Sequence, residues 1–197
     1  MQFKPFEPGI EVSGESLGAI VAGFKKFPAV AQKYLVKFGF LKSNQNINEL
    51  DRTAWYPQEA WLLAFEAIAN EVGVNSLYGV GRLIPENSTF PPEMTDVISA
   101  LGAMDVAYHL NHRKNGIVMF DPLTGHMLEG IGHMLATPVA NESRVVMVCE
   151  DPYACDFDRG IIAGLANRFD PSAKTLHDNS APCRKKGADS CTYIVWW

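Results

Sequence analysis

The sequence lacks the features that mark membrane, secreted and nucleic-acid-binding proteins. Its 197 residues contain neither an N-terminal secretory signal nor an apolar run approaching the roughly 18 to 20 residues that span a bilayer. Seventeen basic residues against 22 acidic ones give a net charge of −5, which does not suit a general partner of nucleic acid or of anionic membranes. We therefore expect a cytoplasmic protein with no membrane insertion and no nucleic-acid partner.

The sequence also lacks the common catalytic motifs. It contains no GxSxG, HExxH, P-loop or kinase element, and no nucleophile lies at a recognisable spacing from a base. The segment Tyr78–Gly81 contains only GxG, without the preceding strand and third glycine that a dinucleotide site needs. A binding protein is therefore favoured over an enzyme.

The apolar fraction of 47% and the charged fraction of 20% are typical of a soluble globular chain, and the length favours one domain over residues 1–197. We divide it into a helical part, residues 1–90, and a mixed part, residues 91–197. Apolar periodicity and capping residues predict helices and strands along the whole chain. The expected helices cover residues 17–27 (capped by Ser13 or Ser16), 28–40, 57–73, 74–84, 93–113 and 157–169, and the expected strands cover 131–138, 143–151, 173–178 and 190–197.

This order predicts an α+β fold. N-terminal helices precede one long central helix and a small antiparallel sheet, and one helix is inserted before the last strands.

All four cysteines lie in the last quarter of the chain. Between Cys183 and Cys191, a turn with Gly187 and Asp189 brings two thiols together, and Cys155 lies at the entry to a helix. With His177 or Asp178, these three cysteines form a legitimate tetrahedral zinc set, although the spacing is not that of a CxxC knuckle. The alternative is that the thiols are simply buried, as free cysteines often are, and this is what we expect for Cys149.

The central helix carries His109 and His112 at i and i+3, and Asp105 precedes His109 by one turn. Such a histidine is able to hold haem iron or to bond a buried polar ligand. The alternative is an ordinary helix histidine whose bonds are already satisfied. Trp61 and Phe65 belong to an aromatic stripe that forms either core or pocket wall.

A resemblance to a known family rests on the segment Pro152–Ala166, rich in small residues, followed by Cys183-x7-Cys191 and an aromatic strand. This pattern resembles the 4-vinyl reductase domain, the predicted hydrocarbon-binding domain of bacteria and archaea. The match covers roughly residues 150–197. That family shares its fold with the small subunits of the Golgi transport particle and is related to the haem nitric-oxide/oxygen-binding domain.

The resemblance implies two cofactors. Related phenol-sensing regulators hold a structural zinc, and Cys155, Cys183 and Cys191 would map to its thiolates. Ser180 stands at the fourth ligand position of those sensors, so His177 or Asp178 would replace it. The segment MDVAYHL, residues 104–110, resembles the haem-domain helix with the proximal histidine, which makes His109 the axial ligand. The Tyr-x-Ser-x-Arg motif that grips the haem propionates in that family is absent.

We expect a sensor or carrier of a small apolar, aromatic or tetrapyrrole-like ligand that acts through a separate signalling protein. Its expected binding residues are Tyr108, His109, His112, Trp61 and Phe65. The alternatives are a haem-based gas or redox sensor using His109, a vinyl reductase, and a non-enzymatic adaptor subunit. Because related domains pair, a homodimer is expected.

Overall fold

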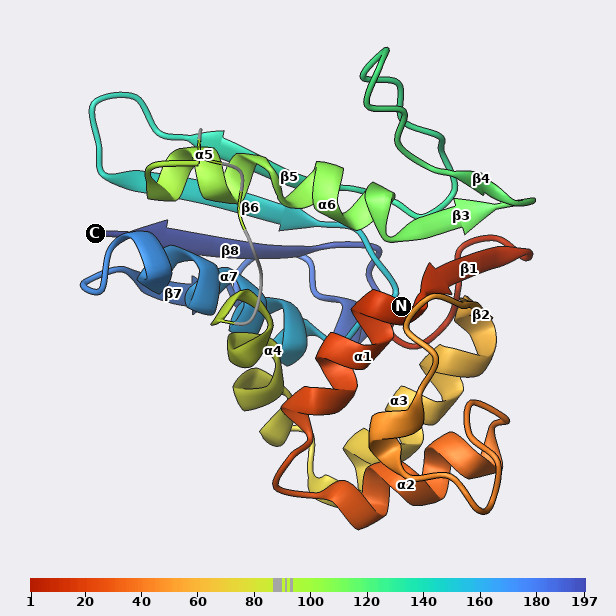
Figure 1. Ribbon diagram of the computed structural model, residues 1–197. Coiled ribbons are helices and arrows are strands. Elements are labelled where there is room, and N and C mark those ends of the chain that lie inside the picture. Colours follow the sequence, from red (N-terminus) through yellow and green to blue (C-terminus); the bar gives the residue numbers. More distant parts are fainter. Residues whose placement is uncertain (87–89, 91, 93) are drawn as a thin grey trace.

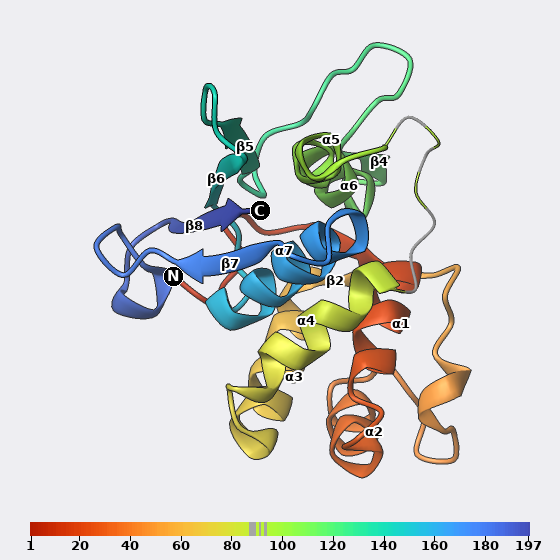
Figure 2. The ribbon, with the colours of Figure 1, turned by 90° about the vertical axis from the view of Figure 1, so that its left-hand side faces the viewer.

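The computed structural model describes residues 1–86, 90, 92 and 94–197, and they form the predicted α+β arrangement. Figure 1 shows the N-terminal helices at one end of the molecule and a twisted sheet at the other. The two short helices within residues 97–110 lie beside the strands of this sheet. The last helix, residues 155–169, lies between the sheet and the N-terminal part (Figure 2). The described helices include none that is long and apolar enough to cross a membrane.

The N-terminal part is helical as predicted. Its elements are β1 (Ile10–Ser13), α1 (Gly14–Gly23), α2 (Pro28–Lys37), the 3-10 turn η1 (Ile47–Glu49), β2 (Trp55–Pro57), α3 (Gln58–Val72) and α4 (Ser76–Glu86). Ser13 caps α1, because its hydroxyl accepts a hydrogen bond from the main-chain N–H of Ser16 at 3.1 Å. Gly73 ends α3 with a φ of 87°, a conformation that glycine adopts without steric cost.

The larger sheet is also the predicted one. Its strands are β5 (Met134–Pro138), β6 (Arg144–Cys149), β7 (Lys174–His177) and β8 (Cys191–Trp196), in the antiparallel order β5-β6-β8-β7. The helix α7 (Cys155–Phe169) is inserted before the last two strands, and the 3-10 turn η2 (Arg184–Lys186) joins these. Strand β6 alternates buried and half-buried residues, so that one face packs on the core.

A second sheet of order β2-β1-β3-β4 was not predicted. It consists of β1, β2, β3 (His112–Lys114) and β4 (Ile117–Val118). These strands have two to four residues each, which is too short for apolar alternation to be recognised. The pairing of β1 with β3 joins the first residues of the chain to its middle.

The single helix expected over residues 93–113 is wrong in its extent. Two helices stand there, α5 (Val97–Gly102) and α6 (Met104–Leu110), and residue 93 lies outside the described part of the chain. Asp96 caps α5 by accepting a bond from the N–H of Ser99 at 2.7 Å. The helix ends before His112 because residues 112–114 pair with β1 instead.

Helices α4 and α7 pack closely through glycines. A methyl group at Gly160 would lie 2.3 Å from the carbonyl oxygen of Tyr78, and one at Gly81 would lie 2.2 Å from that of Phe157. The backbones therefore meet at a distance that only glycine permits. Gly81, the second glycine of the GxG at residues 79–81, serves this packing from inside α4, whereas Gly79 does not.

Candidate functional site

The main candidate site is an apolar cleft of about 490 Å³ between α1, α4, the α5–α6 pair and α7. This volume lies in the range of small-molecule sites. Its lining residues are Ser16, Ile20, Ile84, Pro85, Phe90, Met94, Ala100, Ala103, Met104, Val106, Ala107, Tyr108, Leu110, Asn111, His112, Met134, Tyr153, Phe157, Asp158, Ile161 and Leu165.

Helical periodicity places these side chains. On α7, Phe157, Ile161 and Leu165 follow one another at i, i+4 and i+8 and share one face. Ala103 and Ala107 lie on the cleft side at the start and middle of α6, and Ala107 is exposed. The small alanines leave the cleft open, and the larger side chains of α7 form its floor.

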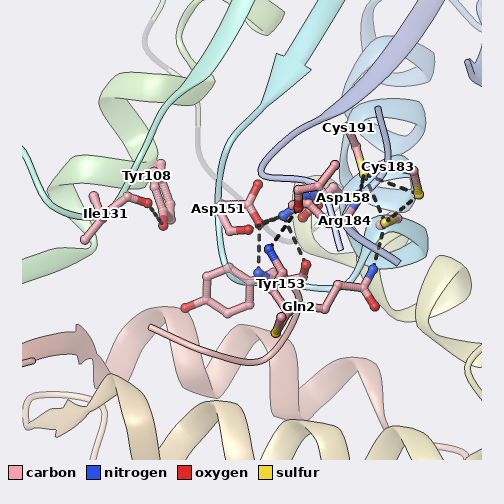
Figure 3. Close-up of polar contacts among 12 residues, drawn as sticks. Gln2, Tyr108, Ile131, Asp151, Tyr153, Asp158, Cys183, Arg184 and Cys191 are labelled. Carbon is pink, nitrogen blue, oxygen red and sulfur yellow. Dashed lines mark hydrogen bonds and ion pairs between the residues drawn. The ribbon is translucent and has the colours of Figure 1, made fainter. Parts of the chain in front are cut away.

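A polar group of His112, Tyr108 and Tyr153 lies in this cleft. The Nδ1 atom of His112 is 2.8 Å from the carbonyl oxygen of Tyr108, and because a carbonyl only accepts, Nδ1 carries the proton. The Nε2 atom is 3.1 Å from the hydroxyl of Tyr153. Burial lowers the pKa of His112 to about 4, so the imidazole is neutral at pH 7. The hydroxyl of Tyr108 donates to the carbonyl of Ile131 at 2.8 Å (Figure 3).

A buried ion-pair network adjoins the floor. The guanidinium of Arg184 forms ion pairs with Asp151 and Asp158, and all three side chains are fully buried (Figure 3). Arg184 also donates to the carbonyl of Tyr153 at 3.1 Å. Burial and the neighbouring carboxylate of Asp151 raise the pKa of Asp158.

The two expected aromatic walls, Trp61 and Phe65, are core residues one layer behind the cleft. Both are fully buried, and their rings stack at 5.4 Å. Phe65 meets Phe157 edge-on at 5.1 Å. They therefore support the floor and do not line the cleft themselves.

His109 lies on the opposite face of α6 from the cleft. Its Nδ1 donates to the carbonyl of Asp105 at 2.8 Å, and its ring lies 5.0 Å from that of His133. Asp105 accepts bonds from the Met134 N–H and from His133 Nδ1, both at 2.9 Å. Although burial opposes ionisation, these bonds and that of His109 lower the pKa of Asp105 to about 2. The bond to Asp105 raises the pKa of His133.

The structure brings together the four residues expected to bind a metal. The Sγ atom of Cys155 lies 3.0 Å from that of Cys191 and 3.8 Å from that of Cys183. His177 contributes its imidazole to the same group, in which all four ligand atoms lie within 4.8 Å of one another. Its Nε2 is buried and makes no hydrogen bond of standard geometry with the described residues.

The carboxylate of Asp178, the other fourth-ligand candidate, instead accepts hydrogen bonds from the main-chain N–H and the hydroxyl of Ser180. Cys149 lies in β6 outside the group of four.

The close contact of two thiols changes their acidity. The hydrogen bond with Cys155 lowers the pKa of Cys191, and the main-chain N–H of Arg184 also points to this sulfur at 3.3 Å. The same bond raises the pKa of Cys155. A lowered pKa favours the thiolate of Cys191, the form that binds metals. Gln2 donates to Cys155 at 2.7 Å (Figure 3).

Sequence reasoning missed Tyr153, Asp158 and Arg184 as site residues. The signal for Asp158 was present, since it stands three residues before Ile161 and seven before Leu165, on the apolar face of a helix. A carboxylate on a buried face needs a partner. Nothing local pointed to Arg184, whose partners lie 26 and 33 residues away in the sequence.

No family model matches the chain, and neither does any curated protein. Membership in the 4-vinyl reductase family therefore remains a prediction.

Solved structures of H-NOX domains are similar to the chain. One is an H-NOX protein from S. oneidensis in the Fe(II)NO ligation state, at 14% identity and a TM-score of 0.60, covering 90% of this chain and 97% of that one. Another is a point mutant of T. tengcongensis H-NOX, at 20% identity and a TM-score of 0.56, covering 90% and 92%. A third, from work on heme distortion in the H-NOX family, has 18% identity and a TM-score of 0.64 and covers 94% of each chain. The chain has an H-NOX-like fold, which fits the superfamily indicated by the resemblance.

Proposed function

We propose that this chain is a ligand-binding sensor domain whose ligand occupies the cleft between α6 and α7 and which signals through a separate protein. The observation that carries the proposal is the cleft itself: about 490 Å³, a largely apolar lining, and a neutral imidazole beside a tyrosine hydroxyl. Binding sites for small molecules combine such an apolar wall with a few polar groups that fix orientation.

A substitution at the open side of the cleft tests this proposal. Ala107→Trp adds an indole at an exposed position of α6, so the fold is retained while the cleft is obstructed. Native mass spectrometry of the purified protein should detect a retained small molecule in the wild type and none in the variant. Ala140→Trp, in the exposed turn between β5 and β6, is the matched control. If the two variants retain the same amount of small molecule, the ligand does not occupy this cleft.

Haem is a second candidate ligand, and the comparisons favour it over a small apolar molecule. Several of the similar structures are described by their haem or by an Fe(II)NO state. The residues present do not fit a haem held by His109, because this imidazole points away from the cleft toward Asp105 and His133. Among the described lining residues no Lys or Arg is available for the two propionates, and His112 is the one imidazole.

Reconstitution with hemin separates these candidates. Given the geometry of the cleft, we expect no Soret band of a histidine-ligated haem in the visible spectrum. A band that disappears in His109→Ala but not in His112→Ala would establish the haem sensor with His109 as axial ligand. A band that disappears only in His112→Ala would place the haem in the cleft on the other histidine.

We further propose that Cys155, His177, Cys183 and Cys191 hold a structural zinc ion, and this proposal is supported by geometry alone. The residues fit the ion, since three sulfurs and one unbonded imidazole nitrogen are a preferred tetrahedral donor set. Bound zinc would tie the start of α7 to β7 and β8. Native mass spectrometry should find one zinc per chain, lost in Cys183→Ala and retained in Cys149→Ala. If both variants retain zinc, the assignment of these four residues as its ligands is contradicted.

The adaptor reading predicts a dimer without a bound small molecule. Light scattering gives the assembly state, and the mass spectrum of the same sample gives the bound mass. A homodimer that carries a ligand supports the sensor, whereas an empty dimer supports the adaptor.

A further inference from the structure

The buried network beside the cleft contains two carboxyl groups and one guanidinium. Two carboxylates, Asp151 and Asp158, share one guanidinium, that of Arg184, and the three side chains are fully buried. No Lys or Arg is found among the described residues that line the cleft. When both acids are ionised, the network therefore carries one uncompensated negative charge, which a dry interior disfavours.

Asp158 is the member of this network that reaches the cleft. It stands on the face of α7 that also presents Ile161 and Leu165 to the cleft, at i+3 and i+7. Its Oδ2 takes the bond from Arg184, whereas its Oδ1 is buried and has no hydrogen-bond partner among the described residues. Burial of a carboxylate oxygen without a hydrogen-bond partner costs free energy, and a ligand that supplies a donor would recover it.

Away from the cleft, the sulfur of Cys191 adds a further repulsion to that of Asp151, whereas the surroundings of Asp158 on the cleft side are apolar or neutral. Phe157, Ile161 and Leu165 surround it on α7, and His112 is held neutral by its bond to the Tyr108 carbonyl and by burial. A cation brought by a ligand would balance the network and bond the free oxygen at once, while an aromatic or aliphatic body would fill the rest of the cleft. A ligand with a carboxylate would instead add a second uncompensated negative charge.

We propose that the cleft selects an apolar ligand that carries a positively charged amine, and that Asp158 is the residue that recognises the amine. This inference rests on the proposed function, because it requires a ligand in the cleft. It adds the chemical class of that ligand and a specificity-determining residue.

Three probes of one shape test the inference: 2-naphthylmethylamine, 2-naphthalenemethanol and 2-naphthoic acid, titrated by calorimetry into the full chain. The wild type should bind the amine about tenfold or more tightly than the alcohol, and the acid most weakly. In Asp158→Asn the affinity for the amine should fall to that for the alcohol. The affinity for the alcohol should change by less than about twofold. Glu150→Gln, which removes an exposed carboxylate outside the cleft, should keep the preference for the amine.

The outcomes separate this inference from the proposed function. Binding of the alcohol as tight as that of the amine in the wild type overturns the recognition by Asp158 and leaves the cleft as a binding site. A preference for the amine that survives in Asp158→Asn overturns it as well. No binding of any probe, the alcohol included, overturns both proposals. If Asp158→Asn does not fold, the ranking of the three probes on the wild type decides, since an amine that ranks below the alcohol or the acid contradicts the proposal.

Discussion

At the scale of single residues, two histidines near α6 have pKa values that are shifted in opposite directions. His112 is buried and neutral, with a pKa lowered to about 4. His133 is half-buried beside Asp105, which raises its pKa. The two imidazoles therefore affect the stability of the fold in opposite directions as the pH changes.

The first prediction concerns acid. An unfolded histidine has a pKa near 6.5, so between pH 6.5 and about 4 the unfolded state binds a proton that folded His112 does not. This group should therefore remove about 3 kcal/mol of stability as the pH falls through that window. His133 acts in the other direction, since its contribution is complete below pH 6.5 and is lost as the pH rises through its raised pKa.

Urea unfolding of the wild type and of His112→Gln at several pH values between 4 and 7 measures the effect. The variant should lose less stability on acidification than the wild type. His126→Gln, which removes an exposed histidine, serves as the control. If the variant and the wild type have the same pH dependence, His112 is not the residue responsible.

Which residues form the site was only partly predictable from the sequence. The group of three cysteines and His177 follows from their clustering and their chemistry, and the structure places them together. The orientation of His109 does not follow, because i and i+3 spacing suggested that His109 and His112 share one face. The chain leaves the helix after Leu110, so His112 reaches the cleft from a strand while His109 stays on the far side of α6.

At the scale of secondary-structure elements, the packing of α4 on α7 positions the floor of the cleft. Glycines at 81, 160 and 164 let these two helices approach each other closely. Because α7 carries Phe157, Asp158 and Ile161, any separation of the helices moves the floor.

The second prediction compares two glycines of this helix pair. Gly160→Ala should destabilise the protein by about 1 to 3 kcal/mol, because the methyl group would lie 2.3 Å from the Tyr78 carbonyl oxygen. Gly79→Ala, in α4, meets nothing within 4 Å and should stabilise by about 0.5 to 1 kcal/mol. Thermal and chemical denaturation measure both. Equal effects of the two changes would show that the close packing does not limit stability.

Long elements with a clear period were predicted, and short ones were not. α3 and the hairpin β5–β6 follow from periodicity, a glycine stop and a turn at Asn141. The break at Ala103 follows Gly102, but a single glycine within a long apolar period is not enough to predict it. The end of the helical segment before His112 depends on pairing with β1, a contact between residues about a hundred positions apart, and local pattern cannot reveal such a contact.

At the scale of the whole molecule, Arg184 connects regions that are distant in the sequence. It follows Cys183 of the thiol group, pairs with Asp151 after β6 and with Asp158 on α7, and bonds the carbonyl of Tyr153. Its side chain therefore bonds Asp158 and Tyr153 of the cleft, while its main-chain N–H contacts Cys191 of the proposed metal site.

The third prediction is that Arg184→Met destabilises the protein by about 3 to 5 kcal/mol, because it leaves two buried carboxylates without their cation. Lys33→Met removes the exposed ion pair with Glu71 and should have no measurable effect. Guanidinium unfolding at pH 7 gives both values. A small loss for Arg184→Met would mean that the carboxylates are neutral in the folded protein and need no cation.

The stacked pair of Trp61 and Phe65 has an optical consequence. Trp61 is shielded from water, and Phe65 touches Phe157 and Tyr153, which form part of the cleft floor. A ligand that shifts the floor changes the packing around this indole without touching it. Its emission then reports occupancy of the cleft without a dye. Replacing Trp55, Trp196 and Trp197 by phenylalanine leaves Trp61 as the one tryptophan, whose emission is isolated by excitation at a wavelength that tyrosine does not absorb.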